Sequence, residues 1–347
     1  MSVVCVQGLG AVSAAGWGVA PLREAIEKNA ALPAGTLPRP GWTKLLRVRP
    51  VPPPPQRPSF LAHPRLRRAS PLSQHAVAAS IEALGEDVPD VQSGKLQLGI
   101  VVCLMPGCVS YSRRFYEEVL NDPATASPLI FPETVFNAPA SHLAAFLNST
   151  AVSYTLVGDN GAFLQGLAIA AGWLSGTDMD ACLIIGAEEL DWIVADAMRL
   201  FQKNIIQTAG AGALYLKKGS FHGQTVQIAL ITDPFSFDSA SGRAEAARAM
   251  RAQLPDSCAH DLLCTGTLGI PRVDRHELAA WADWQDKRIA PKVLLGEAFT
   301  ASAAFQTVLA CDALKRNRCD GANVSVVGAN QQAIGARFVR IQRSKSE

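Results

Sequence analysis

Short apolar runs alternate with longer segments of helical spacing along most of the chain. The apolar runs predict strands at Ser2 to Gln7, Leu96 to Leu104, Tyr154 to Val157, Ala181 to Gly186, Ala213 to Lys218, Thr225 to Ile231, Asp261 to Cys264 and Ala290 to Gly296. Apolar residues three or four positions apart predict helices at Pro21 to Glu27, Ser70 to Leu84, Tyr111 to Leu120, Ala162 to Ser175, Arg243 to Leu254, Asp274 to Trp284 and Thr300 to Lys315, with another that begins near Asn137. A hairpin is expected over residues 322–341. This alternation in both halves predicts an α/β fold with mostly buried sheets.

The first helix boundaries are marked by turn and cap residues. Ser70 followed by Pro71 is a typical N-cap and first-turn pair.

Residues 34–58, with VPPPPQRP at their end, predict an extended surface loop, because proline fixes φ and removes a hydrogen-bond donor. A polyproline ligand for a partner protein is the alternative for this segment.

The N-terminal segment is expected to be a strand followed by a glycine-containing loop, Gly8 to Gly16. A dinucleotide-binding turn would need a third glycine where Ser13 stands, and no acidic residue follows at the end of a second strand, so NAD binding is not expected. The first basic residue is Arg23, which argues against a secretory signal. No run of 18 or more apolar residues predicts a membrane span.

Composition narrows the class further. The chain has 347 residues, 48% of them hydrophobic, which is enough for two domains or one large duplicated one. A formal net charge of +2 disfavours nucleic acid as a partner. The eight cysteines are scattered through apolar runs, which predicts reduced thiols and a cytoplasmic location. A zinc site at Cys258, His260 and Cys264 is not expected, because it lacks a fourth ligand and paired spacing.

The stretch from Tyr154 to Glu189 is predicted to be a strand, a tight turn at residues 158–161, a buried helix and a second strand, with Gly176 and Asp178 ending the helix. Such a turn places one side chain at a helix N-terminus, where free N–H groups favour developing negative charge. Acyl-transfer enzymes often carry their nucleophile there. Here the turn offers Asp159 and Asn160, neither of which is a good acyl acceptor.

Two further features have functional and structural alternatives. Arg65, Arg67 and Arg68 form a cationic patch that could contact an acidic partner such as a carrier protein, although a solvated loop is the simpler interpretation. His142 lies among apolar helix residues and is expected to be a core or interface histidine rather than a catalytic base.

The order of several short motifs resembles the β-ketoacyl synthases of fatty-acid and polyketide assembly. These motifs are VVCVQGLGAVSAAGWGV, FPETVFNAPASHLAAFL, the turn-helix-strand ending in IIGAEE, GAGALYL, CTGTLG, KVLLGE and VVGAN. The resemblance implies the thiolase fold: two similar halves, residues 1–220 and 221–347, in a five-layer αβαβα arrangement. It also implies an active site between the halves and a dimer built through the N-terminal half.

The family's catalytic cysteine and two histidines are replaced in this chain. The resemblance places Asn160 at the cysteine, Leu263 at the first histidine and Glu297 at the second, while Lys292 of the K-x4-GH pattern survives. Condensation needs a thiolate, oxyanion donors and neutral imidazoles. A carboxylate at Glu297 would repel both malonate and an enolate, so ketosynthase activity at this site is not expected.

The resemblance therefore implies a non-catalytic subunit of the chain-length-factor type. Such a subunit forms a heterodimer with an active ketosynthase; a homodimer remains an alternative, and an acyl carrier protein is a further expected partner. No cofactor or metal is expected. The alternative function is a divergent acyltransferase or decarboxylase with a rewired site that uses Cys108, Cys264, Glu297 or Asp159. A carboxylate beside Cys264 would make that thiol a poor nucleophile.

Overall fold

The computed structural model describes residues 3–150, 152–176, 179–219, 225–256, 258–329 and 331–341. The predicted domain boundary at 220 and 221 and the predicted helix stop at Asp178 lie outside these residues, so both stay predictions. Within the described ranges, no helix has the length and apolar character needed to cross a bilayer.

Ten strands form two groups of five that have the same order. The first group runs β6 (Ser153–Val157), β5 (Leu98–Leu104), β7 (Ala181–Glu188), β9 (Gly210–Lys218) and β1 (Val4–Ser13). The second runs β13 (Lys287–Ile289), β12 (Asp261–Cys264), β14 (Gly321–Val327), β15 (Gln332–Ile341) and β10 (Thr225–Ile231). In each group the first two pairings are parallel and the last two are antiparallel. The two groups meet where β1 pairs antiparallel with β10.

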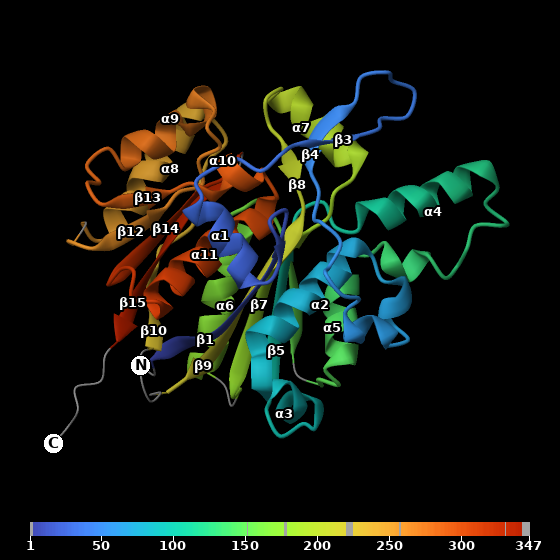
Figure 1. The fold of residues 1–347 in the computed structure, drawn as a ribbon, viewed down its shortest axis with the longest axis horizontal. Coiled ribbons are helices and arrows are strands. Elements are labelled where there is room, and N and C mark those ends of the chain that lie inside the picture. The colour runs from blue at the N-terminus through green and yellow to red at the C-terminus, as the bar shows by residue number, and fades with distance from the viewer. Residues whose placement is uncertain are drawn as a thin grey trace.

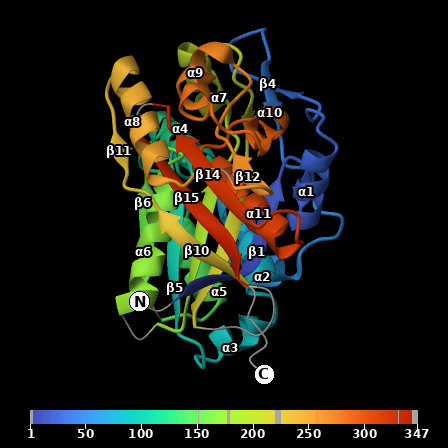
Figure 2. The same cartoon turned by 90° about the vertical axis from the view of Figure 1, so that its left-hand side faces the viewer.

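Helices cover the strands in layers, as Figures 1 and 2 show. α6 (Ala162–Gly176) and α11 (Phe299–Lys315) pack between the two groups of strands. α2 (Pro71–Leu84) and α5 (Ala138–Phe146) cover the outer face of the first group, and α8 (Ala240–Gln253) and α9 (Pro271–Ala280) lie outside the second. The predicted layered α/β arrangement is confirmed.

The remaining elements connect or extend these layers. They are α1 (Val19–Glu27), α3 (Val88–Gln92), α4 (Val109–Asn121), α7 (Trp192–Phe201), α10 (Pro291–Leu295), β2 (Gly16–Trp17) and β11 (Phe235–Ser236). A separate small sheet contains β3 (Gly35–Leu37), β4 (Leu46–Arg49) and β8 (Gln207–Thr208).

Glycine allows the central layer to close. A Cβ at Gly212 of β9 would lie 2.7 Å from the Cβ of Ala304 in α11, and one at Gly186 of β7 would lie 2.5 Å from the Thr300 carbonyl oxygen. Real side chains do not approach this closely, so α11 can lie against the first strand group only because these positions lack side chains. This close approach brings the start of α11 to the start of α6.

The N-terminal strand is longer than the sequence predicted. β1 continues from Val4 to Ser13, so the expected loop Gly8 to Gly16 is wrong over most of its length. A Cβ at Gly8 or Gly10 would lie 1.8 Å from a backbone oxygen of α2, Ala83 or Ala79 respectively. These glycines therefore serve close strand–helix packing rather than a phosphate-binding turn.

Two other predicted segments need correction. Residues 290–296 were expected to be strand-like but contain the short helix α10, which has Pro291 at its first position and ends at Gly296 with a φ of 101°. The segment 34–58 is not wholly irregular, because β3 and β4 lie within it and Leu46 and Val48 are buried. Its polyproline portion contains no helix or strand.

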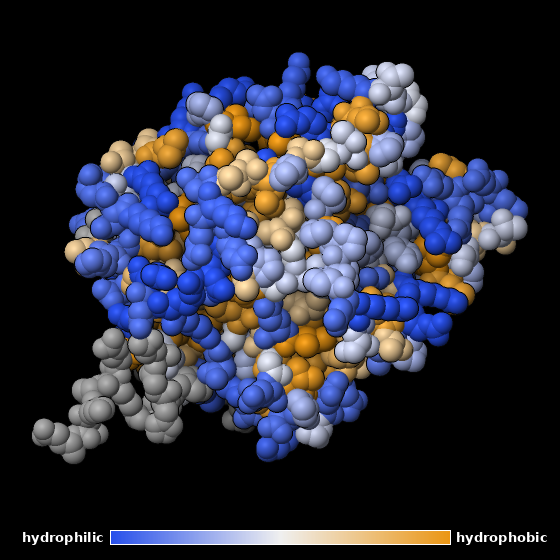
Figure 3. All heavy atoms as spheres, viewed as in Figure 1, coloured by the Kyte–Doolittle hydropathy of each residue, from blue (hydrophilic) through white to orange (hydrophobic). Residues whose placement is uncertain are grey.

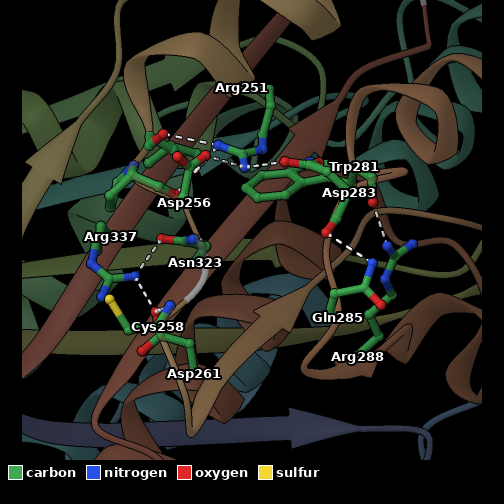
Figure 4. Close-up of polar contacts among 12 residues, drawn as sticks. Arg251, Asp256, Cys258, Asp261, Trp281, Asp283, Gln285, Arg288, Asn323 and Arg337 are labelled. Carbon is green, nitrogen blue, oxygen red and sulfur yellow. Dashed lines mark hydrogen bonds and ion pairs between the residues drawn. The ribbon is translucent and has the colours of Figure 1, made fainter.

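The other predicted helices are present with small boundary shifts. Ser70 caps α2 as expected, since its side chain accepts a hydrogen bond from the N–H of Ser73. Asn137 precedes α5 but makes no side-chain cap. In the second half, Arg251 of α8 lies over the Trp281 ring at 4.6 Å and pairs with Asp256 and Asp283, which ties α8 to the chain after α9 (Figure 4).

Candidate functional site

Asn160 lies in the turn between β6 and α6 and is only 2% exposed. Its Nδ2 donates to Glu297 Oε1 at 2.9 Å and to the carbonyl oxygen of Phe299 at 2.9 Å. Both acceptors come from the segment that leads into α11, in the second half of the chain. Asn160 therefore links the start of α6 to the start of α11.

Glu297 is the centre of this contact. Its Oε2 accepts from Lys292 Nζ at 2.8 Å, and its Oε1 also accepts from the N–H of Phe299 at 2.8 Å. The side chains of Lys292 and Glu297 are 4% and 8% exposed. The lysine neutralises the carboxylate, so repulsion of an anionic substrate is weaker than the sequence indicated. We call Asn160, Lys292, Glu297 and Phe299 the Asn160 network.

A cavity of about 450 Å³ opens beside the Asn160 network. Its apolar lining includes Val194, Met198 and Phe201 of α7, and Leu268 and Val273 from the second half of the chain. The cavity is therefore largely apolar with a small number of polar groups, as is typical of small-molecule sites. No histidine lines it among the described residues.

Asp159 lies beside Asn160 but belongs to a different set of contacts. Its Oδ1 accepts from the N–H of Gly161 at 3.0 Å, and its own N–H donates to Gln331 Oε1 at 2.9 Å. Oδ2 faces Gly328 so closely that a Cβ there would lie 1.8 Å away. Burial raises the pKa of Asp159. Its contacts tie α6 to the β14–β15 region and do not present the carboxylate to the cavity.

The structure separates the other predicted site residues from the Asn160 network. Leu263 packs with Met250 and Trp281 in the apolar core outside the second strand group. Cys264 is fully buried in the central core, and burial raises its thiol pKa well above the ordinary value. Neither residue lines the cavity. The Cys264 thiol is therefore not an exposed nucleophile beside Glu297.

Cys108 and His142 are also away from this cavity. Cys108 is buried at the N-cap of α4 near Ser70, and burial raises its thiol pKa to about 12. His142 Nε2 lies 2.8 Å from a carboxylate oxygen of Glu133, as expected for a histidine with a structural partner. In the described part of the chain, no three His, Cys, Asp or Glu residues are placed to hold a metal ion.

Sequence reasoning missed two acidic residues and an arginine that line the cavity. Glu277 accepts from the N–H of Gly266 at 2.8 Å and from Ser325 Oγ at 2.6 Å, and burial raises its pKa. Asp274 accepts from two backbone N–H groups of the preceding loop. Arg243 of α8 donates to two carbonyl oxygens. The spacing of Asp274 and Glu277 on one helix face was the available signal.

The polar groups at the cavity are therefore largely hydrogen-bonded within the protein. Asn160 donates both amide hydrogens to internal acceptors, and both Glu297 oxygens accept internal hydrogen bonds. Covalent acyl transfer needs a free nucleophile with an adjacent base. The arrangement can bind an apolar group in the cavity, and it holds the two halves of the chain together at this point.

Comparison with solved structures identifies the fold. The ishigamide ketosynthase/chain length factor superposes with a TM-score of 0.80 at 17% sequence identity, over 98% of this chain and 100% of that chain. A β-ketoacyl synthase from Burkholderia phymatum gives 0.79 at 17% identity, over 99% and 100%. The ketosynthase ApeO in complex with its chain length factor ApeC from Xenorhabdus doucetiae gives 0.79 at 12% identity, over 98% of each chain.

Sequence comparison adds no closer relation. No protein-family model matches the sequence, and no curated protein matches it. The structural matches extend over nearly the full length of this chain and of the compared chains. The chain therefore has the layered thiolase fold of the ketosynthase and chain-length-factor structures.

Proposed function

We propose that this chain is a non-catalytic ketosynthase-like subunit of the chain-length-factor type, which pairs with an active β-ketoacyl synthase in polyketide, polyene or fatty-acid biosynthesis. The observation that carries this proposal is the Asn160 network. A carboxamide stands at the start of α6, and its donors are bound to Glu297 and the Phe299 carbonyl. An amide in this state neither attacks a thioester nor carries an acyl group.

The rest of the cavity supports a site without condensation chemistry. Lys292 is paired with Glu297, and the cavity lining includes no histidine. Condensation requires donors that stabilise a developing oxyanion or enolate. Because the buried thiol of Cys264 lies in the core, no specific observation favours the rewired acyltransferase or decarboxylase.

The structural neighbours support the kind of partner. They include a ketosynthase in complex with its chain length factor, and a type II polyketide ketosynthase in complex with an acyl carrier protein and bound to a hexaketide. We carry these partners to this chain as part of the proposal. The proposal also includes a cytoplasmic location, which is supported by the eight free cysteines.

The surface of the first half supports pairing. β6 is the end strand of its sheet, and Val152, Tyr154 and Val157 along it are about half exposed. An apolar edge strand readily adds another strand. Large exposed side chains also gather on α4 and the segment after it, Tyr116, Leu120, Leu129, Phe131 and Phe136. In Figure 3 hydrophobic residues interrupt the polar surface of this protruding region.

Co-expression tests this proposal directly. The tagged chain is produced with candidate ketosynthases from the same genome, and the complex is sized by gel filtration and its subunit ratio measured. We expect a stable 1:1 complex with one of them. Substituting Tyr154→Asp on the β6 edge should abolish pairing while leaving the fold intact. The control variant Lys95→Ala, at a distant exposed position, should leave pairing unchanged. A chain that purifies only as a self-contained homodimer would refute the heterodimer.

A further inference from the structure

A second cavity, which we call the arginine cleft, lies between the start of α8 and the start of α9. Its volume is about 560 Å³, and its lining includes Arg243 of α8 together with Arg272 and Arg275 of α9. The two helices lie side by side outside the second strand group, at the upper left of Figure 1. Three guanidinium groups from neighbouring helices therefore line one cleft.

These guanidinium groups donate to neutral acceptors rather than to carboxylates. Arg243 donates to two backbone carbonyl oxygens. Arg272 Nη2 donates to Gln202 Oε1 at 3.2 Å, and Arg275 Nε donates to His276 Nε2 at 3.0 Å. Within the described residues none of the three arginines forms an ion pair. Their charges therefore remain available to an anion from outside the chain.

The acidic groups near the cleft do not balance this charge. Among the described residues the cleft lining contains a single carboxylate, the exposed Asp238, against three arginines. Asp274 and Glu277 act on Arg243 from nearby, but both are buried. Asp274 accepts from two backbone N–H groups, and Glu277 accepts from one N–H and one hydroxyl group. The cleft surface therefore has an excess of positive charge.

Two further features add to the positive potential of the cleft. The pKa of His276 is lowered by partial burial and by three nearby arginines, among them Arg248. The first residue of α8, Ala240, lines the cleft, and the first turn of α8 contains no acidic residue. The N-terminus of a helix carries a partial positive charge that favours anions. The cleft is therefore suited to an anionic group.

The arginine cleft adjoins the apolar cavity beside the Asn160 network. Arg243, Val273 and Ala329 line both cavities. Arg243 Nε has no hydrogen-bond partner within the described residues, so a buried donor without an acceptor lies at this boundary. A cationic surface and an apolar surface thus meet at Arg243, and one molecule with a charged head and an apolar chain can contact both.

We propose that the two cavities together bind an amphiphilic anion: its phosphate or carboxylate head lies against Arg272 and Arg275, and its apolar chain enters the cavity past Arg243. Charge-assisted hydrogen bonds from guanidinium groups hold the head, and burial of methylene groups adds affinity for the chain. Binding needs only the unpaired chain, so it depends neither on the proposed function nor on a ketosynthase partner.

Calorimetric titration of the full chain with simple amphiphiles tests this site. The probes are decyl phosphate, decanoate, butyl phosphate and the cation decyltrimethylammonium. We expect binding of decyl phosphate or decanoate, and the tighter of the two identifies the head group. Each buried methylene tightens binding about fourfold, so partial burial of the decyl chain should make decyl phosphate at least about tenfold tighter than butyl phosphate. The cation should bind much more weakly than either decyl anion.

Variants locate the head and the chain. Arg272→Gln combined with Arg275→Gln should weaken binding of the decyl anion at least about tenfold, because both residues are exposed and the fold is retained. The matched control, Arg65→Gln with Arg67→Gln, removes the same charge from exposed positions in the first half and should change nothing. Leu268→Asn, in the apolar cavity, should reduce the advantage of decyl over butyl phosphate without weakening butyl phosphate.

Several results would overturn the proposal. It is wrong if neither decyl anion binds, if the decyl cation binds equally well, or if chain length has no effect. It is also wrong if the cleft variant binds as the wild type does, if the control variant loses binding, or if Leu268→Asn leaves the advantage of the longer chain unchanged. Because the unpaired chain is titrated, failure here is distinct from failure to bind a ketosynthase.

Discussion

Removing Glu297 should destabilise the chain strongly, because its partner Lys292 would remain buried. Both side chains are less than one-tenth exposed, and Glu297 also accepts from Asn160 and from the N–H of Phe299. Breaking a buried ion pair by removing one member costs about 3–5 kcal/mol, because the other charge loses its compensation. Glu277 also acts on Lys292 as a nearby carboxylate, so we place Glu297→Ala near the low end, about 3 kcal/mol.

Three variants make this measurement specific. The free energy of unfolding is measured by urea titration for Glu297→Ala, for Lys292→Met combined with Glu297→Gln, and for Lys95→Ala. The double variant removes both charges and keeps an amide oxygen that can accept from Asn160 and from the N–H of Phe299, so it should be within about 1–2 kcal/mol of the wild type. Lys95 pairs with Asp90 at the exposed surface, and its loss should cost less than about 1 kcal/mol. Wild-type stability in Glu297→Ala would refute the reasoning that the Asn160 network holds the two halves together.

Three further predictions concern the same region. Asn160→Cys should not produce condensation or malonyl decarboxylation in a carrier-protein assay, because the described cavity lining supplies no histidine; turnover by this single variant would contradict the proposed inactivity. Gly328→Ala should cost at least about 2 kcal/mol in unfolding free energy, since the new Cβ would lie 1.8 Å from Asp159 Oδ2, whereas Gly172→Ala in an open, exposed position of α6 should be neutral or stabilising by up to about 1 kcal/mol; equal effects would count against the packing argument. In the native protein one thiol, Cys258, should react rapidly with a disulfide reagent, while the other seven react only on unfolding. Rapid labelling of Cys264 would favour the alternative function, a rewired site that uses this thiol.

The sequence was sufficient for the layered fold because most helices and strands are long and strongly patterned. It failed where a short segment has two interpretations. Residues 290–296 carry apolar residues that suit a strand or one helical turn equally well, and the choice depends on Pro291 and Gly296 at the ends. Gly8 and Gly10 indicated a loop in the sequence. In the structure they allow β1 to contact the backbone of α2, which lies far away in the sequence.

The candidate site was recovered in part for a similar reason. Asn160, Lys292 and Glu297 lie in short motifs at the ends of helices, and the structure brings them together. Leu263 was assigned by its place in a motif, yet it lies within β12 and its side chain packs into the outer core. Glu277 was missed because its partners, the N–H of Gly266 and the hydroxyl of Ser325, are supplied only by the folded chain. Sequence spacing does not show such contacts.

Acylation of the purified pair tests the central claim most directly. The complex with the active ketosynthase is incubated with a medium-chain acyl thioester, and the intact mass of each subunit is measured. The account predicts an acyl adduct on the ketosynthase alone, lost when that subunit's catalytic cysteine is replaced, and no adduct on this chain. An acyl adduct on this chain, formed at a rate similar to that of the ketosynthase, would contradict the account.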